Sequence, residues 1–439
     1  MNYKTLINKA LEANIEAMEV TYNATNKTSC TIFNHEIESY EISNQSSINA
    51  RGIFNGKLGL ASTEKLDNKS CQYIIDSIKN SASYNEKEEE PIIFKGSKKY
   101  TKKNTFNKEL AEIDVNEKIK NLRLLEEAAY KESSLVTDVE VSYEEVTNEK
   151  VLANSYGLTL KEKTNYYLYA VEVVCKKGDE IKTDFDIFLE SDYSKFDYEK
   201  LAKEVVEKAV SKFDGISIKA KTYKCVMAPE VTSNLLRAMV NAGFDAEAVQ
   251  KQSSILAGKL NQQVFSNRVT ILEKPLEKNC FFTYFDYEGV ATYNKTLVDK
   301  GVIKTYLYNL ETAKKDNVES TGNGYGENKI GTSTVNLTLK AGKKSEEDII
   351  AQAKNGIYVT SVTGLHSGLN AQSGDFSLEA EGYLIKDGKK DQPLKLLTIG
   401  GNIYTLFNEV VAIANNEKRG PSSVSCPSIL VKKLKVSSL

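Results

Sequence analysis

Hydrophobic positions in the first part of the chain change their spacing twice. Apolar residues between positions 6 and 18 recur three and four residues apart, which predicts an amphipathic helix. In residues 28–54, short β-branched runs alternate with polar positions, and the Asn55-Gly56 pair that follows predicts a tight hairpin turn. Helical spacing returns in residues 67–82. These patterns predict one helix–strands–helix unit.

A second unit repeats this order of elements. Asp114 and Glu117 form the capping pair of a predicted helix. Strand-like runs fill residues 138–190, and helical spacing over residues 197–213 closes the unit. The repeated order raises the hypothesis of an internal duplication.

Beyond about residue 220 the pattern becomes mainly β, with Gly-rich corners. A few helices interrupt it: one opens at Pro229, one starts at Ser345, and one covers residues 402–414. A charged stretch around Pro91 is predicted to be a solvated linker. We therefore expect an α+β protein with two N-terminal helix–strands–helix units and a mainly β C-terminal domain. The expected domains are residues 1–92, 93–218 and 219–439.

The charge balance narrows the range of partners. With 58 basic and 60 acidic side chains, the net charge is -2. Clustered Lys and Arg are what neutralise nucleic-acid phosphates, so we expect no direct nucleic-acid contact. No run approaches the roughly 20 apolar residues of a membrane-spanning helix, and the N-terminal residues lack the apolar region of a signal peptide. We expect a cytoplasmic protein that does not contact a membrane.

Histidine is scarce, which limits the chemistry that this chain can support alone. The only two are His35, expected on the surface at a strand boundary, and His366 in the segment GLHSGLNAQSGDFS. A nucleophile-and-base site around His366 is one hypothesis, and a Gly-rich turn whose polar groups bind the backbone is the favoured alternative. The hydroxyl and thiol groups that such a site could use belong to Ser367, Ser373, Ser377 and Cys426.

Two further motifs invite a chemical interpretation. Asp286 and Glu288 would share one face of an extended segment and could act as general acid and base, although a turn or a salt bridge is the favoured interpretation. The loop TGNGYGENKIG is rich in glycine, but Glu327 replaces the last glycine of a dinucleotide-binding motif. A Gly-rich β corner is therefore expected there.

Several motifs, in this order along the chain, resemble the TldD/PmbA family of metallopeptidases and modulators of DNA gyrase. They are RGIFNGKLGLAST, ANSYGL, FDYEGVAT, STGNG, GLHSGLNAQSGDFS and TIGGNIYTLFNE. In TldD-type members an H-E-x-x-x-H helix holds the metal. The matching helix of this chain carries Arg237, Ala238 and Ala242 near those positions. Arg and Ala offer no zinc ligand, so the chain resembles the PmbA (TldE) branch.

The resemblance also implies which residues of this chain belong to the site. Asn370, Gly374, Asp375, Phe376 and Ser377 match a family signature. A second signature matches Gly401 and Asn402, and His366 precedes the first. These residues would line a peptide cleft or, as we favour, hold loops in shape. No catalytic residue is expected in this chain.

The expected function is that of a partner subunit. The resemblance implies a cytoplasmic heterodimer with a TldD-type metallopeptidase chain, which degrades unfolded peptides or processes precursor peptides. Zinc would be held by that partner, with no cofactor or metal in this chain. Three alternatives stay open: a homodimer, a stand-alone hydrolase with a non-metal nucleophile near His366, and a non-enzymatic protein that modulates DNA gyrase.

Overall fold

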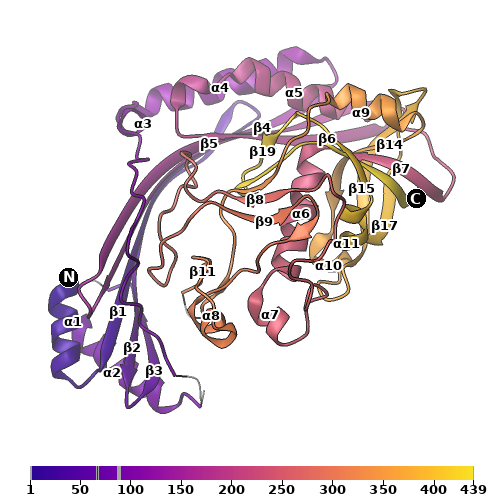
Figure 1. Cartoon of the computed structure of the whole chain (residues 1–439). Coiled ribbons are helices and arrows are strands. Elements are labelled where there is room, and N and C mark those ends of the chain that lie inside the picture. Colours follow the sequence, from indigo (N-terminus) through magenta and orange to yellow (C-terminus); the bar gives the residue numbers. More distant parts are fainter. Residues whose placement is uncertain (1, 66, 68, 87–89, 328, 439) are drawn as a thin grey trace.

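A long, curved antiparallel sheet forms the N-terminal half of the molecule and arches around the C-terminal half (Figure 1). The computed structural model describes residues 2–65, 67, 69–86, 90–327 and 329–438. Six strands pair in the order β3-β2-β1-β4-β5-β6. They are β1 (Ala17–Phe33), β2 (Glu36–Phe54), β3 (Lys57–Thr63), β4 (Val136–Asn154), β5 (Thr159–Lys177) and β6 (Glu180–Glu190). Both predicted units therefore contribute three strands to one sheet.

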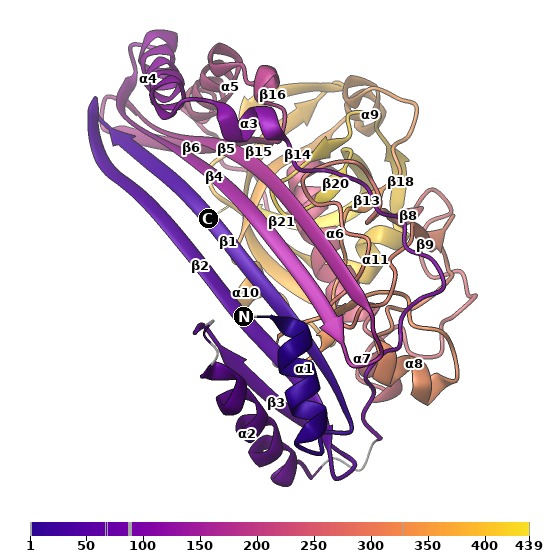
Figure 2. The same cartoon turned by 90° about the vertical axis from the view of Figure 1, so that its left-hand side faces the viewer.

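Helices from both units cover the same face of this sheet, at opposite ends (Figure 2). On β1, Met18 and Val20 pack under α1 and α2, whereas Cys30 and Ile32 pack under α4 and α5. All four side chains are at even positions, and a strand alternates its side chains between two faces. We call this the outer face; the opposite, inner face meets the C-terminal half. The N-terminal helices are α1 (Tyr3–Glu12), α2 (Ser70–Ser83), α3 (Lys108–Glu112), α4 (Val115–Glu132) and α5 (Tyr198–Val210).

The C-terminal half contains a sheet that closes on itself. Strand β14 pairs with both β7 and β15, which joins the two ends of the order β7-β21-β17-β15. The strands of this sheet are β7 (Lys221–Met227), β14 (Gly356–Thr363), β15 (Asp375–Lys386), β16 (Lys389–Pro393), β17 (Leu397–Asn402), β18 (Val410–Ile413) and β21 (Ile429–Ser438).

A second sheet and the helices α6 to α11 make up the rest of the C-terminal half that the structure describes. The sheet has the order β10-β9-β8-β13-β20-β19, and β11 pairs with β12 apart from it. Its strands are β8 (Ile271–Glu273), β9 (Lys295–Asp299), β10 (Val302–Ile303), β13 (Leu337–Leu339), β19 (Lys418–Arg419) and β20 (Val424–Cys426), and the separate pair is β11 (Gly324–Tyr325) with β12 (Gly331–Thr332). The helices are α6 (Pro229–Gly243), α7 (Ala246–Gln250), α8 (Leu310–Asp316), α9 (Glu346–Ala353), α10 (Leu365–Gly368) and α11 (Ile403–Asn408).

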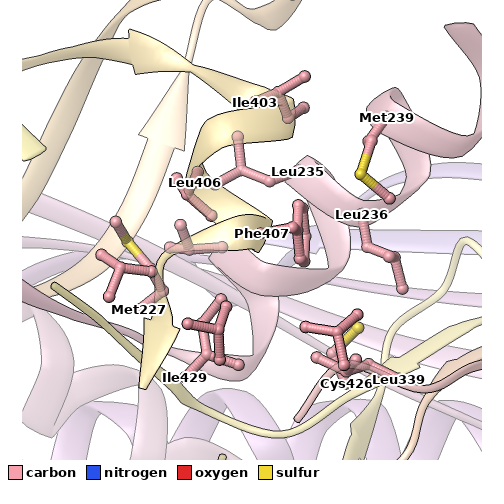
Figure 3. Close-up of a cluster of buried hydrophobic side chains, with 14 of the residues drawn as sticks. Met227, Leu235, Leu236, Met239, Leu339, Ile403, Leu406, Phe407, Cys426 and Ile429 are labelled. Atoms are coloured by element: carbon pink, nitrogen blue, oxygen red, sulfur yellow. The ribbon is translucent and has the colours of Figure 1, made fainter. Parts of the chain in front are cut away.

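One large apolar cluster forms the core of the C-terminal half (Figure 3). Helix α6 buries Leu235, Leu236 and Met239, and α11 buries Phe407 against it. Burial of such side chains contributes about 1.5–3 kcal/mol each to folding. No helix among the described residues is both long enough and apolar enough to span a membrane.

The α+β class and the helix–strands–helix order of both units are confirmed. Two predicted helices are too long. The first ends at Glu12 rather than at residue 18, because β1 already pairs with β2 from Ala17 onward. The helix predicted over residues 402–414 ends at Asn408, and the β-branched run that follows forms β18, which pairs with β21.

Candidate functional site

Two motifs from opposite halves of the chain meet in a buried group of charges, which we call the Arg51 cluster: Glu19, Arg51, Asp286 and Glu288. Arg51 on β2 donates two hydrogen bonds to Glu19 Oε1 on β1, at 2.6 and 3.1 Å. Its Nη1 lies 3.7 Å from Glu288 Oε1 in the C-terminal half. One guanidinium therefore faces carboxylates from both halves, and the contact joins the sheet to the C-terminal half.

Asp286 and Glu288 are in different environments although they are two residues apart. Asp286 accepts backbone N–H bonds from Glu288, Val290 and Gly324 at 2.9–3.0 Å. Its complete burial raises its pKa to about 6, and these three hydrogen bonds act in the opposite direction by favouring the ionised form. Glu288 accepts one bond from Leu310 N, at 2.8 Å. Burial, and then the charge of Asp286, raise the pKa of Glu288. The two residues therefore lie in a turn, with the Glu288 carboxyl group beside Arg51, which agrees with the interpretation that the sequence favoured.

We expect the raised pKa of Glu288 to make stability fall with rising pH. Below its ordinary value of 4.5 the carboxyl group is protonated in both the folded and the unfolded chain. At higher pH the unfolded chain ionises first, so the free energy of unfolding falls until the folded pKa is passed. Urea unfolding of the wild type and of Glu288→Gln should give curves that diverge above about pH 4.5. Parallel pH profiles would show that Glu288 has an ordinary pKa.

The STGNG loop closes over the same cluster. Gly324 donates its N–H to Asp286, and a Cβ at this position would lie 2.5 Å from Glu288 Oε2. Asn323 donates to Glu273 at 2.8 Å and accepts from Lys295 at 3.1 Å, within a buried ion pair. The expected Gly-rich β corner is the β11–β12 pair, with Glu327 in its connection; Asn328 lies outside the described residues.

The two predicted signatures in the C-terminal half come together in one hydrogen-bonded network. Asn402 Nδ2 donates to Asp375 Oδ1 at 3.0 Å and to the Ser373 carbonyl at 2.8 Å. Asp375 also accepts from the Ser373 hydroxyl, and these bonds lower its pKa. Asn370 Oδ1 accepts the N–H groups of Gln372 and Ser373, both at 3.0 Å. Each of these hydrogen bonds joins two parts of the loop or ties the loop to Asn402, and so holds the loop in its shape.

This network, which we call the signature network (Asn370, Ser373, Asp375 and Asn402), lies beside the C-terminal end of α6. Tyr404 makes the connection: its ring packs on Gly374, where a Cβ would lie 2.5 Å away, and its hydroxyl lies against Gly243. Asn402 also caps α11 by accepting from Tyr404 N and Thr405 N. It lines a surface pocket of about 280 Å³.

The remaining signature residues differ in exposure. Phe376 is buried in the core, with its ring near Gly401. Ser377 is exposed and pairs with Gly400 across the sheet. The structure thus supports a structural role for Phe376 and leaves the Ser377 hydroxyl facing solvent.

The helix that the sequence matches to the metal motif is α6, and the three residues named for that motif do not fit a catalytic zinc. Arg237 is exposed, and Ala238 and Ala242 are half-buried. A zinc site needs imidazole, thiolate or carboxylate ligands, and these three side chains supply none. Across the part of the chain that the structure describes, no group of three His, Cys, Asp or Glu residues is placed to hold a metal ion.

Neither histidine lies in a catalytic arrangement. His366 is exposed on α10, and among the described contacts no hydrogen bond or ion pair joins its imidazole to a hydroxyl, thiol or carboxylate. His35 is exposed in the turn between β1 and β2, as predicted, where its Nδ1 lies 3.3 Å from Glu126. Cys426 is buried against Ser233 of α6, and burial raises the pKa of its thiol to about 12. A buried neutral thiol is a poor nucleophile.

Comparison with known proteins identifies the family. Residues 108–213 match the PmbA/TldA metallopeptidase central domain, and residues 220–438 match the PmbA/TldA metallopeptidase C-terminal domain. The matches cover well over half of the chain. The chain belongs to the TldD/PmbA family of metallopeptidases.

Relatives and solved structures agree with this assignment. A metalloprotease PmbA homolog of Buchnera aphidicola is 27% identical over 332 residues, which are 74% of this chain and 71% of the relative. A Thermotoga maritima protein described as a modulator of a DNA gyrase superposes with a TM-score of 0.92, at 27% identity and over 99% of both chains. TldE from Thermococcus kodakarensis has the same fold, with a TM-score of 0.89 at 23% identity over 99% of this chain and 100% of that one.

Sequence reasoning did not single out Arg51 or Glu19 as site residues. Arg51 begins the RGIFNG motif, and the sequence offers one signal for it: a charged side chain inside a predicted strand, between Ala50 and Gly52. Because Glu19 and Arg51 are paired across β1 and β2, that ion pair could have been found only by placing these two strands in register.

Proposed function

We propose that this chain is the PmbA (TldE)-type subunit of a cytoplasmic TldD/TldE-type peptidase complex, and that a TldD-type partner holds the zinc. The observation that carries this proposal is that α6 contains no histidine, and that Arg237, Ala238 and Ala242 are the residues which the sequence places near the family's metal-binding positions. The chain belongs to a metallopeptidase family, which is the reason to expect that the complex cleaves peptides. The substrates would be unfolded peptides or precursor peptides.

The role of this chain would be to complete the peptide chamber and to stabilise the partner. The signature network supports this role, because it builds an ordered, partly exposed loop beside α6 whose polar side chains bind one another and the loop backbone. In the catalytic partner a loop of this kind would lie next to the metal-binding helix. In this chain the loop would form part of the wall of the peptide chamber.

The test measures zinc content and peptide hydrolysis for this chain alone, for a TldD-type partner alone, and for their mixture. We expect about one zinc per heterodimer, none in the isolated chain, and hydrolysis that requires the partner's H-E-x-x-x-H motif. The control is the mixture containing a partner whose motif glutamate is replaced by Gln. Stoichiometric zinc in the isolated chain together with hydrolysis would overturn the proposal. Activity of the isolated chain that His366→Ala abolishes would support the stand-alone hydrolase instead.

A further inference from the structure

The two sides of the long sheet differ in whether side chains bind the outward backbone groups of the edge strand. Strand β6 is one edge, and its own carboxylates cap its backbone: Asp184 accepts the N–H of Phe185 at 2.8 Å, and Asp186 accepts that of Ile187 at 2.9 Å. Lys212 donates to the Thr183 carbonyl at 2.8 Å. Native proteins block edge strands in this way against unwanted pairing. The β6 edge is therefore closed to another strand.

The opposite edge is open over much of its length. Strand β3 pairs with β2 only from Ile48 to Phe54, so residues 36–47 of β2 form the rim of the sheet (Figure 2). We call residues 36–47 the open edge. At about 3.4 Å per residue it is roughly 40 Å long. Among the described residues, no strand or side chain binds its outward backbone groups.

Apolar side chains follow the open edge on the outer face of the sheet. Ile37, Tyr40 and Ile42 are 46%, 46% and 64% exposed. Ile37 is paired with Ile32 and Tyr40 with Cys30, and both of these partners point into the core under α4 and α5. The three exposed side chains thus continue a buried apolar surface beyond the helices, next to unpaired backbone. An added strand would cover them.

All the charged side chains of the open edge are acidic. It carries Glu36, Glu38 and Glu41 and contains no Lys or Arg. Nearby on the sheet, Glu140 and Glu172 are direct cross-strand partners. Burial and the charges of Glu172 and Glu38 raise the pKa of Glu140. A second copy of this strand would bring the same carboxylates, whereas a basic strand would neutralise them.

We propose that the open edge binds an extended, basic peptide segment by β-strand addition. Backbone hydrogen bonds to residues 36–47 would supply affinity, and alternate side chains would supply selectivity. Apolar side chains of the segment would cover Ile37, Tyr40 and Ile42, while Lys or Arg would lie near Glu38 and Glu41. The inference rests on the proposed peptide-handling function and names the class of peptide.

The test uses a fluorescent peptide of twelve residues with alternating Lys and Val as the probe, with binding to the full chain followed by anisotropy at fixed ionic strength. We expect the double variant Glu38→Lys/Glu41→Lys to weaken binding about tenfold or more. The matched control, Glu112→Lys/Glu132→Lys, makes the same change in net charge at exposed positions on α3 and α4 and should bind as the wild type. Equal weakening in both variants would overturn the proposal.

A second probe separates strand addition from simple charge attraction. The same peptide with every backbone nitrogen methylated keeps its side-chain charges but can donate no backbone hydrogen bond from either edge, so we expect about tenfold weaker binding. Undiminished binding would contradict strand addition. Self-association of the chain that Glu38→Lys/Glu41→Lys abolishes, without any binding of the probe, would make the edge an interface between copies and would also overturn the proposal.

These outcomes are distinct from those that test the proposed function. If a mixture with a TldD-type partner hydrolyses peptides while the probe does not bind the open edge, the inference fails and the subunit role stands. If the probe binds in the expected way but the mixture is inactive, the subunit role fails and the open edge stands as a peptide-binding strand.

Discussion

Replacing Arg51 with Met is expected to lower the free energy of unfolding by about 3–5 kcal/mol, because it leaves the buried carboxylate of Glu19 without its countercharge. Glu19 would lose both hydrogen bonds from the guanidinium, and Glu288 would keep the charge of Asp286 nearby. The change would weaken the contact between the sheet and the C-terminal half. Urea unfolding, followed by far-ultraviolet circular dichroism, measures the loss.

An exposed ion pair supplies the control for this prediction. Lys177 binds Asp214 at the surface, where their side chains are 49% and 72% exposed. Because water and salt screen such pairs, Lys177→Met should cost less than about 1 kcal/mol. If Arg51→Met cost no more than this control, the Arg51 cluster would contribute little to holding the two halves together.

Replacing Phe407 with Ala is expected to destabilise the protein by about 3–5 kcal/mol. Its ring is completely buried between α11 and α6, where Leu235 and Leu236 lie nearby (Figure 3). Removing it would leave a cavity that the close-packed helix and strands around it can fill only in part. The same urea experiment measures this loss.

Phe185 is the matched residue for the second prediction. It is 50% exposed on the edge strand β6, so Phe185→Ala removes the same atoms without opening an internal cavity. We expect it to cost less than about 1 kcal/mol. Similar losses for both variants would mean that the core around Phe407 can collapse to fill the space.

Local patterns predicted the α+β class and most elements, and failed where pairing between distant strands decided the outcome. Ile15 and Met18 fit the helical spacing of residues 6–18 and are buried, yet they follow the end of α1. The chain becomes extended there because β2 and β4 flank β1 on both sides. Strand pairing over such separations leaves no signature in a local hydrophobic period.

The candidate site was predictable in its C-terminal part and not at the contact between the two halves. The signature residues Asn370, Asp375 and Asn402 were named from sequence motifs, and the structure brings them into one network. Asp286 and Glu288 were recognised as a pair, but their countercharge Arg51 comes from the opposite half of the fold. Only the folded structure shows which positively charged side chain lies beside these buried carboxyl groups.

The shared sheet has a consequence for how the chain is made. Strand β1 pairs with β4 from Glu19 opposite Asn154 to Phe33 opposite Glu140, so its partner is translated long after it. At about 5–20 residues per second, β1 would wait roughly 6–25 s on the ribosome with one long edge unpaired. During that interval the nascent hairpin of β1 and β2 is a target for misassembly, and its reliance on chaperones should be greatest before residue 154 emerges.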